Sequence, residues 1–279
     1  MKLLDTFAGI GGFSYAAEKL VGGFETTQFI EINPYCQKVL NKHWSHVPIH
    51  DDITTFTAKS GEFDIITGGF PCQDISVAGL QKGITKETRS GLFYELIRVI
   101  RMVRPKYVVL ENVAAILNRG LDIVLRELYE AGYDAEWSVI SASSLGACHQ
   151  RSRWWLVAYP QSQSSNGSEL RSSFNKKSSV SKSGNCDIQS SYPNSKRLQG
   201  LRGEHELQES IRKRTFTWRN SGITLNPNWK RYKSKPTLCR GDDGLSHRVD
   251  RLKALGNSIV PQVAAIPLQR VKDLYATAS

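Results

Sequence analysis

Residues 2–13 read KLLDTFAGIGGF, an apolar β-strand pattern that runs directly into a turn containing three glycines. Gly9, Gly11 and Gly12 stand where a helix pattern begins, over residues 13–20. Glycine lets a ligand approach the backbone closely, and a helix N-terminus supplies backbone N–H groups that have no partner within the helix. The stretch therefore predicts a ligand-binding turn between the first strand and the first helix. A tight turn without a ligand is the alternative interpretation.

Working outward from this stretch, strand and helix patterns alternate as far as residue 160. Strands are predicted at residues 2–7, 27–32, 63–67, 107–110, 136–140 and 153–158, and helices at residues 13–20, 34–43, 92–103 and 122–131. Several of the strands are continuously apolar, as strands covered on both faces are. Such alternation indicates βαβ units, so we predict an α/β fold with a doubly wound, mostly parallel sheet. In such sheets, ligands bind beyond the C-terminal ends of the strands.

Composition excludes several classes of protein. The 279 residues are 40% hydrophobic and 23% charged, as in a globular protein. No apolar run approaches 18 residues, and the N-terminus lacks the apolar core of a signal peptide, so neither membrane spanning nor secretion is expected. Five scattered cysteines without a CxxC pair argue against a disulfide framework or a zinc ribbon and fit a cytoplasmic protein; no metal site is predicted.

The positive charge is concentrated in one part of the chain. Residues 161–240 contain 16 Lys and Arg against 5 Asp and Glu, while the other residues hold 21 of each sign. We call residues 161–240 the basic segment. It begins with a Ser- and Asn-rich half, and in its second half aromatic residues alternate with Arg and Lys. The segment predicts a nucleic-acid partner, with a solvated tail as the alternative. The sequence therefore divides into three regions: residues 1–160, the basic segment, and residues 241–279, where a last helix is predicted over residues 261–275.

Two acidic residues stand at predicted strand ends after the glycine turn. Glu31 comes about 20 residues after the turn, where a nucleotide-binding fold uses an acid to hold ribose hydroxyls. A solvated charge at a strand end is the alternative for Glu31. Asp52, followed by Ile53, is too ordinary a pair to carry weight alone.

The stretch GGFPCQ, residues 68–73, ends another buried strand and points to a nucleophile. Pro71 fixes the backbone directly before Cys72, so a rigid turn presents the thiol at the C-terminal edge of the sheet. A small inert cysteine is the alternative, and it is our interpretation of Cys36 and Cys148.

Charged residues flank two more strand patterns. Glu111 follows the apolar strand YVVL, where burial would raise its pKa and suit it to general acid chemistry. An exposed acid or a helix-cap partner is the alternative. Arg151 and Arg153 precede the strand WWLVA, and alternate strand residues point to one face, so both are predicted to reach the same ligand. A pair of surface charges is the alternative for these arginines.

Taken in order, these features resemble the motifs of the cytosine-C5 DNA methyltransferases of bacterial or phage modification systems. The resemblance covers residues 1–160 and about 236–279, and it leaves the basic segment unmatched. The matching motifs are FAGIGG (7–12), Glu31-Ile32, Asp52-Ile53, PCQ (71–73), RSGLF (89–93), ENV (111–113), RSR (151–153) and GNS (256–258). One departure is His149, which replaces the family's usual glutamine and whose role is open.

The resemblance implies a Rossmann-like methyltransferase fold with S-adenosylmethionine as the cofactor. It assigns the cofactor to Phe7, Ala8, Gly9, Ile10, Gly11, Gly12, Glu31, Ile32, Asp52, Ile53, Leu92, Asn257 and Ser258. Glu31 would hold the ribose, and Asp52 and Ile53 would border the adenine. Cys72, Glu111, Arg151 and Arg153 would be the catalytic residues.

The implied reaction transfers a methyl group to C5 of a cytosine flipped out of a specific duplex DNA sequence, through a bond between Cys72 and C6. Double-stranded DNA is the implied partner, and the chain is expected to be a monomer. The resemblance allows for a companion restriction endonuclease, whose existence is open, and implies no direct contact with it. Two alternatives remain. One is a tRNA cytosine-C5 methyltransferase, whose Cys-Phe-Thr signature is absent here; the other is a weakly active DNA-binding relic.

Overall fold

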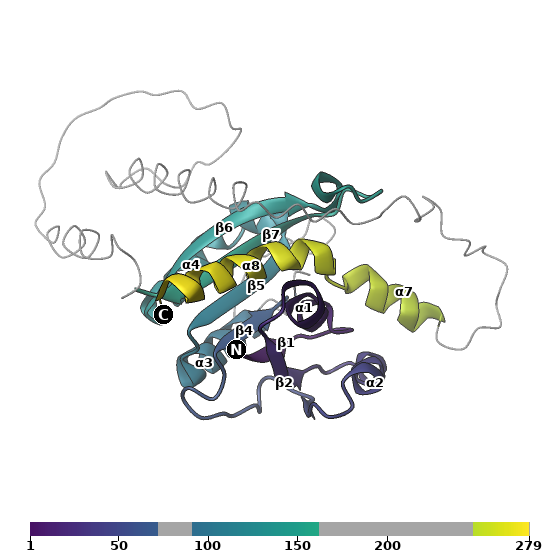
Figure 1. Cartoon of the computed structure of the whole chain (residues 1–279), viewed down its shortest axis with the longest axis horizontal. Helices are drawn as coiled ribbons and strands as arrows, with labels where there is room; N and C mark the ends of the chain where they lie inside the picture. The colour runs from purple at the N-terminus through teal and green to yellow at the C-terminus, as the bar shows by residue number, and fades with distance from the viewer. Residues whose placement is uncertain (72–90, 162–247, 279) are drawn as a thin grey trace, which may run out of the picture.

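The computed structural model describes residues 1–71, 91–161 and 248–278, and a seven-stranded sheet lies at its centre (Figure 1). The strands are β1 (Lys2–Thr6), β2 (Glu25–Ile30), β3 (Ile49–His50), β4 (Ile65–Gly68), β5 (Tyr107–Val113), β6 (Tyr133–Ser141) and β7 (Ser152–Pro160). Their order is β3-β2-β1-β4-β5-β7-β6, and only β7 runs antiparallel to its neighbours. The predicted doubly wound, mostly parallel sheet is therefore confirmed.

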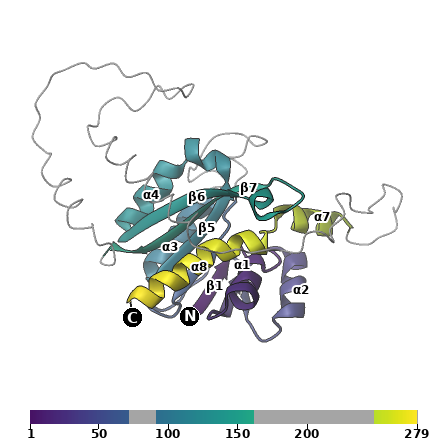
Figure 2. The same ribbon diagram turned by 45° about the horizontal axis from the view of Figure 1, so that its top comes forward.

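Helices cover both faces of this sheet (Figure 2). One face carries α1 (Gly12–Tyr15), its continuation η1 (Ala16–Val21) and the C-terminal α8 (Pro261–Ala278); the other carries α3 (Leu92–Val103) and α4 (Leu121–Glu130). Successive strand residues point to opposite faces, so Leu3 packs with the first group of helices and Leu4 with the second. Both faces are buried, which explains the continuously apolar strands.

The predicted helix at 34–43 is α2 (Pro34–His43), and its start has a clear local cause. The Asn33 side chain accepts hydrogen bonds from the backbone N–H groups of Tyr35 and Cys36, and proline occupies the first helical position. Leu40 and the following Trp44 pack against Phe29 of β2, beside the edge of the sheet. These contacts hold α2 next to the glycine turn.

Several elements differ from the sequence-based prediction. Residues 16–21 form a π-helix, and the short helix α7 (Arg248–Asn257) was not predicted. Its apolar side chains Val249, Leu252 and Leu255 are exposed. The strand predicted at 107–110 runs on to Val113, because β5 continues to pair with β7 as far as Arg153.

The C-terminal region returns to the sheet through α8, which includes the helix predicted over 261–275. In β6, the Glu136 carboxylate is buried, and its Oε1 accepts a 2.6 Å hydrogen bond from Arg270 Nε in α8. Val263, Leu268 and Val271 pack in the same core as Leu3. None of the helices that the structure describes is both long and apolar enough to cross a membrane.

The topology marks one edge of the sheet as the place for a ligand. The chain leaves β1 toward β2 on one side and later returns to place β4 on the other side, so the strand order reverses between β1 and β4. Ligands of doubly wound sheets bind at this switch point, beyond the C-terminal ends of the strands. Because β7 is antiparallel to β5, the start of β7 lies at that same edge.

Candidate active site

The glycine turn at the end of β1 has a backbone that most residues avoid. Phe7, Gly9 and Gly11 have φ values of 52°, 56° and 83°, in the left-handed region. A Cβ on Gly11 would also lie 2.6 Å from the Trp44 ring, whereas a Cβ on Gly9 would meet nothing within 4 Å. The turn packs against the Trp44 ring at Gly11 and is open at Gly9. We call residues 7–12 the glycine cradle, because a ligand can approach its backbone at Gly9.

The Glu31 carboxylate braces this cradle from the end of β2. Its Oε2 accepts a 2.6 Å hydrogen bond from the backbone N–H of Gly9, and its Oε1 accepts a 2.8 Å bond from that of Asn33. Glu31 is only 9% exposed, so the alternative interpretation as a solvated charge is wrong. A carboxylate has about four acceptor positions, so both oxygens retain the capacity to accept hydroxyl donors. The adjacent Ile32 side chain is 72% exposed at the same edge.

The Asp52-Ile53 pair lies in a turn after β3. Asp52 Oδ1 accepts a 2.9 Å bond from the backbone N–H of Thr54, and this bond holds the pKa of Asp52 below its usual value. Ile53 is buried in the core beneath the turn. Leu92, the first residue of α3, packs at the margin of the same core.

The carboxyl group of Glu111 lies over the end of β4. A Cβ on Gly69 would come within 3.3 Å of Glu111 Oε2, and the next residue, Asn112, donates from Nδ2 to the Phe70 carbonyl at 3.2 Å. Strand β5 therefore contacts the backbone that leads into Pro71. Cys72, which follows it, lies outside the described residues.

Glu111 is paired with Arg153 across the two strands. Arg153 Nε lies 3.0 Å from Glu111 Oε1, and the side chains are 24% and 13% exposed. Burial raises the pKa of Glu111 above its ordinary value, although the positive charges of Arg153 and Arg151 act in the opposite direction. A mostly buried carboxyl group with a raised pKa can hold a proton and donate it to a ligand.

A glycine cradle braced by one acid and a second, buried acid paired with arginine occur together at one sheet edge. A model of the C-5 cytosine-specific DNA methylase family matches residues 1–240 of the chain. The chain belongs to this family. The match extends through the basic segment, which the short motifs leave uncovered, and the sheet fits the Rossmann-like fold of methyltransferases that use S-adenosylmethionine.

Two curated relatives agree with this membership. The type II methyltransferase M.CviJI of Paramecium bursaria Chlorella virus IL3A is 38% identical over 160 residues, which are 56% of this chain and 42% of that protein. M.NlaX of Neisseria lactamica is 33% identical over 163 residues, 57% and 52% of the two chains. The chain thus spans about half the length of these curated relatives. The solved Dnmt2 methyltransferase of S. pombe is 25% identical, with a TM-score of 0.49 over 57% and 51% of the chains.

The two arginines of the RSR motif have different partners. Arg151 donates from Nη1 to the Gly256 carbonyl at 3.0 Å and from Nη2 to the Ser258 carbonyl. It precedes β7 with a φ of 33°, so the strand alternation that predicted a common direction with Arg153 does not reach it. Arg153 contacts Glu111, while Arg151 ties the start of β7 to the C-terminal GNS motif. A catalytic role for Arg151 stays a prediction.

That C-terminal motif lies against the glycine cradle. A Cβ on Gly12 would lie 2.9 Å from Ile259 Cβ and 3.1 Å from its carbonyl oxygen, and one on Gly69 would lie 3.7 Å from Ile259 Cδ1. Ile259 therefore packs between the ends of β1 and β4. Ile259 directly follows Ser258, and the roles of Asn257 and Ser258 at the cofactor stay predictions.

Sequence reasoning missed Asp5, a fully buried acid beneath the cradle. Its Oδ2 accepts from the Ser14 hydroxyl at 2.7 Å and its Oδ1 from the Thr67 hydroxyl at 2.8 Å, so it joins β1, α1 and β4. Burial raises the pKa of Asp5 to about 7. An acid inside the apolar run KLLDTF was the available signal, because a buried carboxyl group needs partners.

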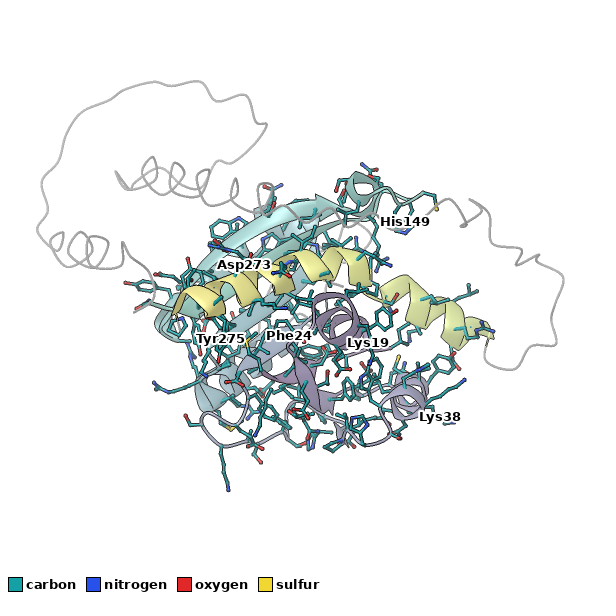
Figure 3. The ribbon with its side chains drawn as sticks, viewed as in Figure 1. Lys19, Phe24, Lys38, His149, Asp273 and Tyr275 are labelled. Atoms are coloured by element: carbon teal, nitrogen blue, oxygen red, sulfur yellow. The ribbon has the colours of Figure 1, made fainter. Side chains whose placement is uncertain are left out.

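Two of the cysteines, Cys36 and Cys148, are among the described residues, as is His149. Cys36 is buried at the start of α2, and burial raises its pKa to about 11, as expected of an inert thiol. Cys148 is exposed. His149 is exposed on the loop between η4 (Ala142–Leu145) and β7 (Figure 3). Among the described residues, no group of three or more His, Cys, Asp or Glu side chains is arranged to hold a metal ion.

Proposed function

We propose that this protein methylates C5 of cytosine in double-stranded DNA with S-adenosylmethionine as the methyl donor. The observation that best supports the proposal is the Glu111–Arg153 pair, which lies over the backbone leading to Pro71 and Cys72. The chain's membership in the C-5 cytosine-specific DNA methylase family agrees with it.

The residues of the cradle fit the proposed cofactor. The open space at Gly9 admits a ligand to the backbone, Glu31 retains acceptor capacity for ribose hydroxyls, and exposed Ile32 offers an apolar surface to adenine. Bound S-adenosylmethionine supplies a methyl group activated by its sulfonium. The chain's own residues hold the cofactor and exclude water from it, with Asn257 and Ser258 on the C-terminal side.

On the base side, each proposed residue has a separate task. Cytosine C5 is a poor nucleophile, and addition of the Cys72 thiolate to C6 would give it enamine character. Protonated Glu111 would hydrogen-bond N3 and assist that addition, while Arg153 would contact O2 and hold the Glu111 carboxyl group. C5 would then attack the methyl carbon, with S-adenosylhomocysteine as the leaving group. Loss of the C5 proton and elimination of the Cys72 thiolate would release 5-methylcytosine. The target carbon lies inside the duplex, so the base must be flipped out.

The test measures methyl transfer to duplex DNA and to tRNA, followed by bisulfite sequencing of the DNA product. We expect transfer to DNA at one recognition sequence, and duplexes containing 5-fluorocytosine should trap the protein covalently because fluorine cannot leave as a cation. Cys72→Ala should abolish both transfer and trapping while leaving cofactor binding intact. Transfer to tRNA alone, or turnover by Cys72→Ala, would refute the proposal.

Three further expectations stay predictions from the sequence. They are the monomeric state, the cytoplasmic location and the existence of a companion restriction endonuclease.

A further inference from the structure

The turn after β3 is held by an arginine that belongs to none of the motifs. Arg98, in the middle of α3, donates from Nη2 to the carbonyls of Ile53 and Thr54 at 2.6 and 3.3 Å, and from Nη1 to that of Phe56 at 3.1 Å. We infer that Arg98 is a positioning residue for the cofactor. It holds the Asp52-Ile53 turn in the shape that borders the adenine. This inference rests on the function proposed above.

The chemistry of these contacts suits arginine. The guanidinium is a planar fork with several N–H donors, and here it reaches carbonyls on both sides of one tight turn. Its Nε is 2.7 Å from Glu95 Oε2, which orients the plane of the fork toward the turn. The Arg98 and Glu95 side chains are 38% and 34% exposed, and ion pairs so exposed contribute little to stability. The position of Arg98 is therefore better explained by its hold on the Asp52-Ile53 turn than by a contribution of its ion pair to the stability of the fold.

Apart from the contacts of Arg98, the backbone hydrogen bonds of this turn are local. Within it, the backbone N–H of Thr55 donates to the Asp52 carbonyl at 3.1 Å and that of Phe56 to the Ile53 carbonyl at 3.3 Å. The side chains of Ile53 and Phe56 pack in the core, and the strand before the turn, β3, has only two residues. Arg98 connects the backbone of the turn to a helix whose Leu96 and Ile100 are fully buried.

The same helix also begins with Leu92, which the family resemblance places against the cofactor. Helix α3 thus carries one proposed cofactor contact, Leu92, directly and supports a second, the Asp52-Ile53 turn, through Arg98. A site whose contacts are held on a rigid, well-packed element keeps its geometry better than one built on loops alone. We therefore expect the loss of Arg98 to act on cofactor binding more than on the chemical step.

Arg101 provides a matched control on the same helix. It lies one turn further along α3, and its Nη2 pairs with Glu127 and Glu130 of α4 at 3.0 and 3.4 Å. Like Arg98 it is a half-exposed arginine in an ion pair, but its partners lie away from the Asp52-Ile53 turn. A purely structural effect of removing an arginine from α3 should appear in both variants.

The experiment compares wild type, Arg98→Ala, Arg98→Lys and Arg101→Ala in the full chain. Calorimetry measures binding of S-adenosylhomocysteine, and steady-state kinetics give kcat and the KM values for S-adenosylmethionine and for DNA. Arg98→Ala should weaken S-adenosylhomocysteine binding and raise the cofactor KM about tenfold, because the turn loses its three hydrogen bonds to the guanidinium. Its kcat and DNA KM should stay within about twofold of wild type. Arg98→Lys should be intermediate, and Arg101→Ala should match wild type.

Two results would overturn the inference. One is cofactor affinity in folded Arg98→Lys and Arg98→Ala equal to that of wild type; the other is an equal loss in Arg101→Ala, which would mark a general effect on α3. A wild-type chain that binds no S-adenosylhomocysteine would refute the proposed function and this inference with it.

Discussion

At the scale of single residues, two buried acids have raised pKa values for the same reason and serve different ends. Glu111 faces the catalytic edge with Arg153 beside it, whereas Asp5 lies beneath the cradle with Ser14 and Thr67 as its partners. In both cases burial outweighs the interactions that favour the ionised form. The location of each acid, rather than its pKa, distinguishes the proposed catalytic group from the structural one.

Glu111→Gln should lower kcat for methyl transfer by at least about 100-fold, because the amide cannot donate the proton that assists addition at C6. Binding of S-adenosylhomocysteine should stay within about twofold of wild type, since Glu111 lies on the base side of the site. Single-turnover kinetics and calorimetry test the two parts. Normal turnover by this variant would exclude Glu111 as the acid.

Asp5→Asn should change how stability depends on pH. Asp5 has a pKa of about 7 in the folded chain and an ordinary value of 3.8 when exposed, so the folded state binds more protons between these values. Stability from this group is therefore full below about pH 4 and is lost as pH rises to about 7. The asparagine variant lacks this loss. Its Tm relative to wild type should rise across that range, and a constant difference would contradict the assigned pKa.

At the scale of elements, the site is assembled by a contact between the two ends of the chain. The segment before α8 packs on the start of α1 through Ile259, and Arg151 holds the carbonyls of Gly256 and Ser258. The contact at Gly12 leaves no room for a methyl group. Close packing of this kind transmits a small change in one element to the other.

Gly12→Ala should displace the 256–260 segment, because the new Cβ would lie 2.9 Å from Ile259 Cβ. We expect a loss of about 1–3 kcal/mol in the free energy of unfolding, as overpacking costs, together with weaker cofactor binding. Adding Ile259→Gly should recover part of both losses, because glycine lacks the clashing Cβ, while the backbone carbonyl at 3.1 Å remains. Denaturant unfolding and calorimetry on the double-mutant cycle measure this coupling, and strictly additive effects would argue against the contact.

At the scale of the whole molecule, charge and catalysis are separated along the chain. The proposed catalytic edge is built from residues 1–160 and the C-terminal region, while the entire net charge of +11 is carried by the basic segment. That segment lies outside the described residues. Its composition predicts contacts with DNA phosphates, and its position in the chain predicts a role in reading the target sequence.

Neutralising Lys176, Lys177, Arg212, Lys213 and Arg214 together should weaken DNA binding and flatten its salt dependence by about one log unit per lost phosphate contact. Cofactor affinity should not change, because none of the proposed cofactor contacts belongs to this segment. Filter binding over a salt series measures the slope. An unchanged slope would mean that the segment is a solvated insertion. The control is a variant with the same number of lysines neutralised within residues 1–60.

The sequence by itself determined the elements and most of the candidate site. Local sequence features predict three parts of the fold. Glycines that adopt positive φ predict the cradle, Asn33 before a proline predicts the start of α2, and apolar runs predict the core strands. Glu31 and Glu111 could be found because acids at the ends of apolar strands stand out. Their hydrogen bonds could not, since these depend on which strands become neighbours.

Only the tertiary structure decided the direction of β7 and the partners of the arginines. In a wholly parallel sheet, residues that precede a strand lie at the edge opposite the ligand, but antiparallel pairing of β7 with β5 brings Arg153 beside Glu111. Arg151 meets the segment at Gly256, 105 positions away, and Arg98 meets Ile53, 45 positions away. Contacts between such distant residues are set by the packing of whole elements, which local sequence patterns do not encode.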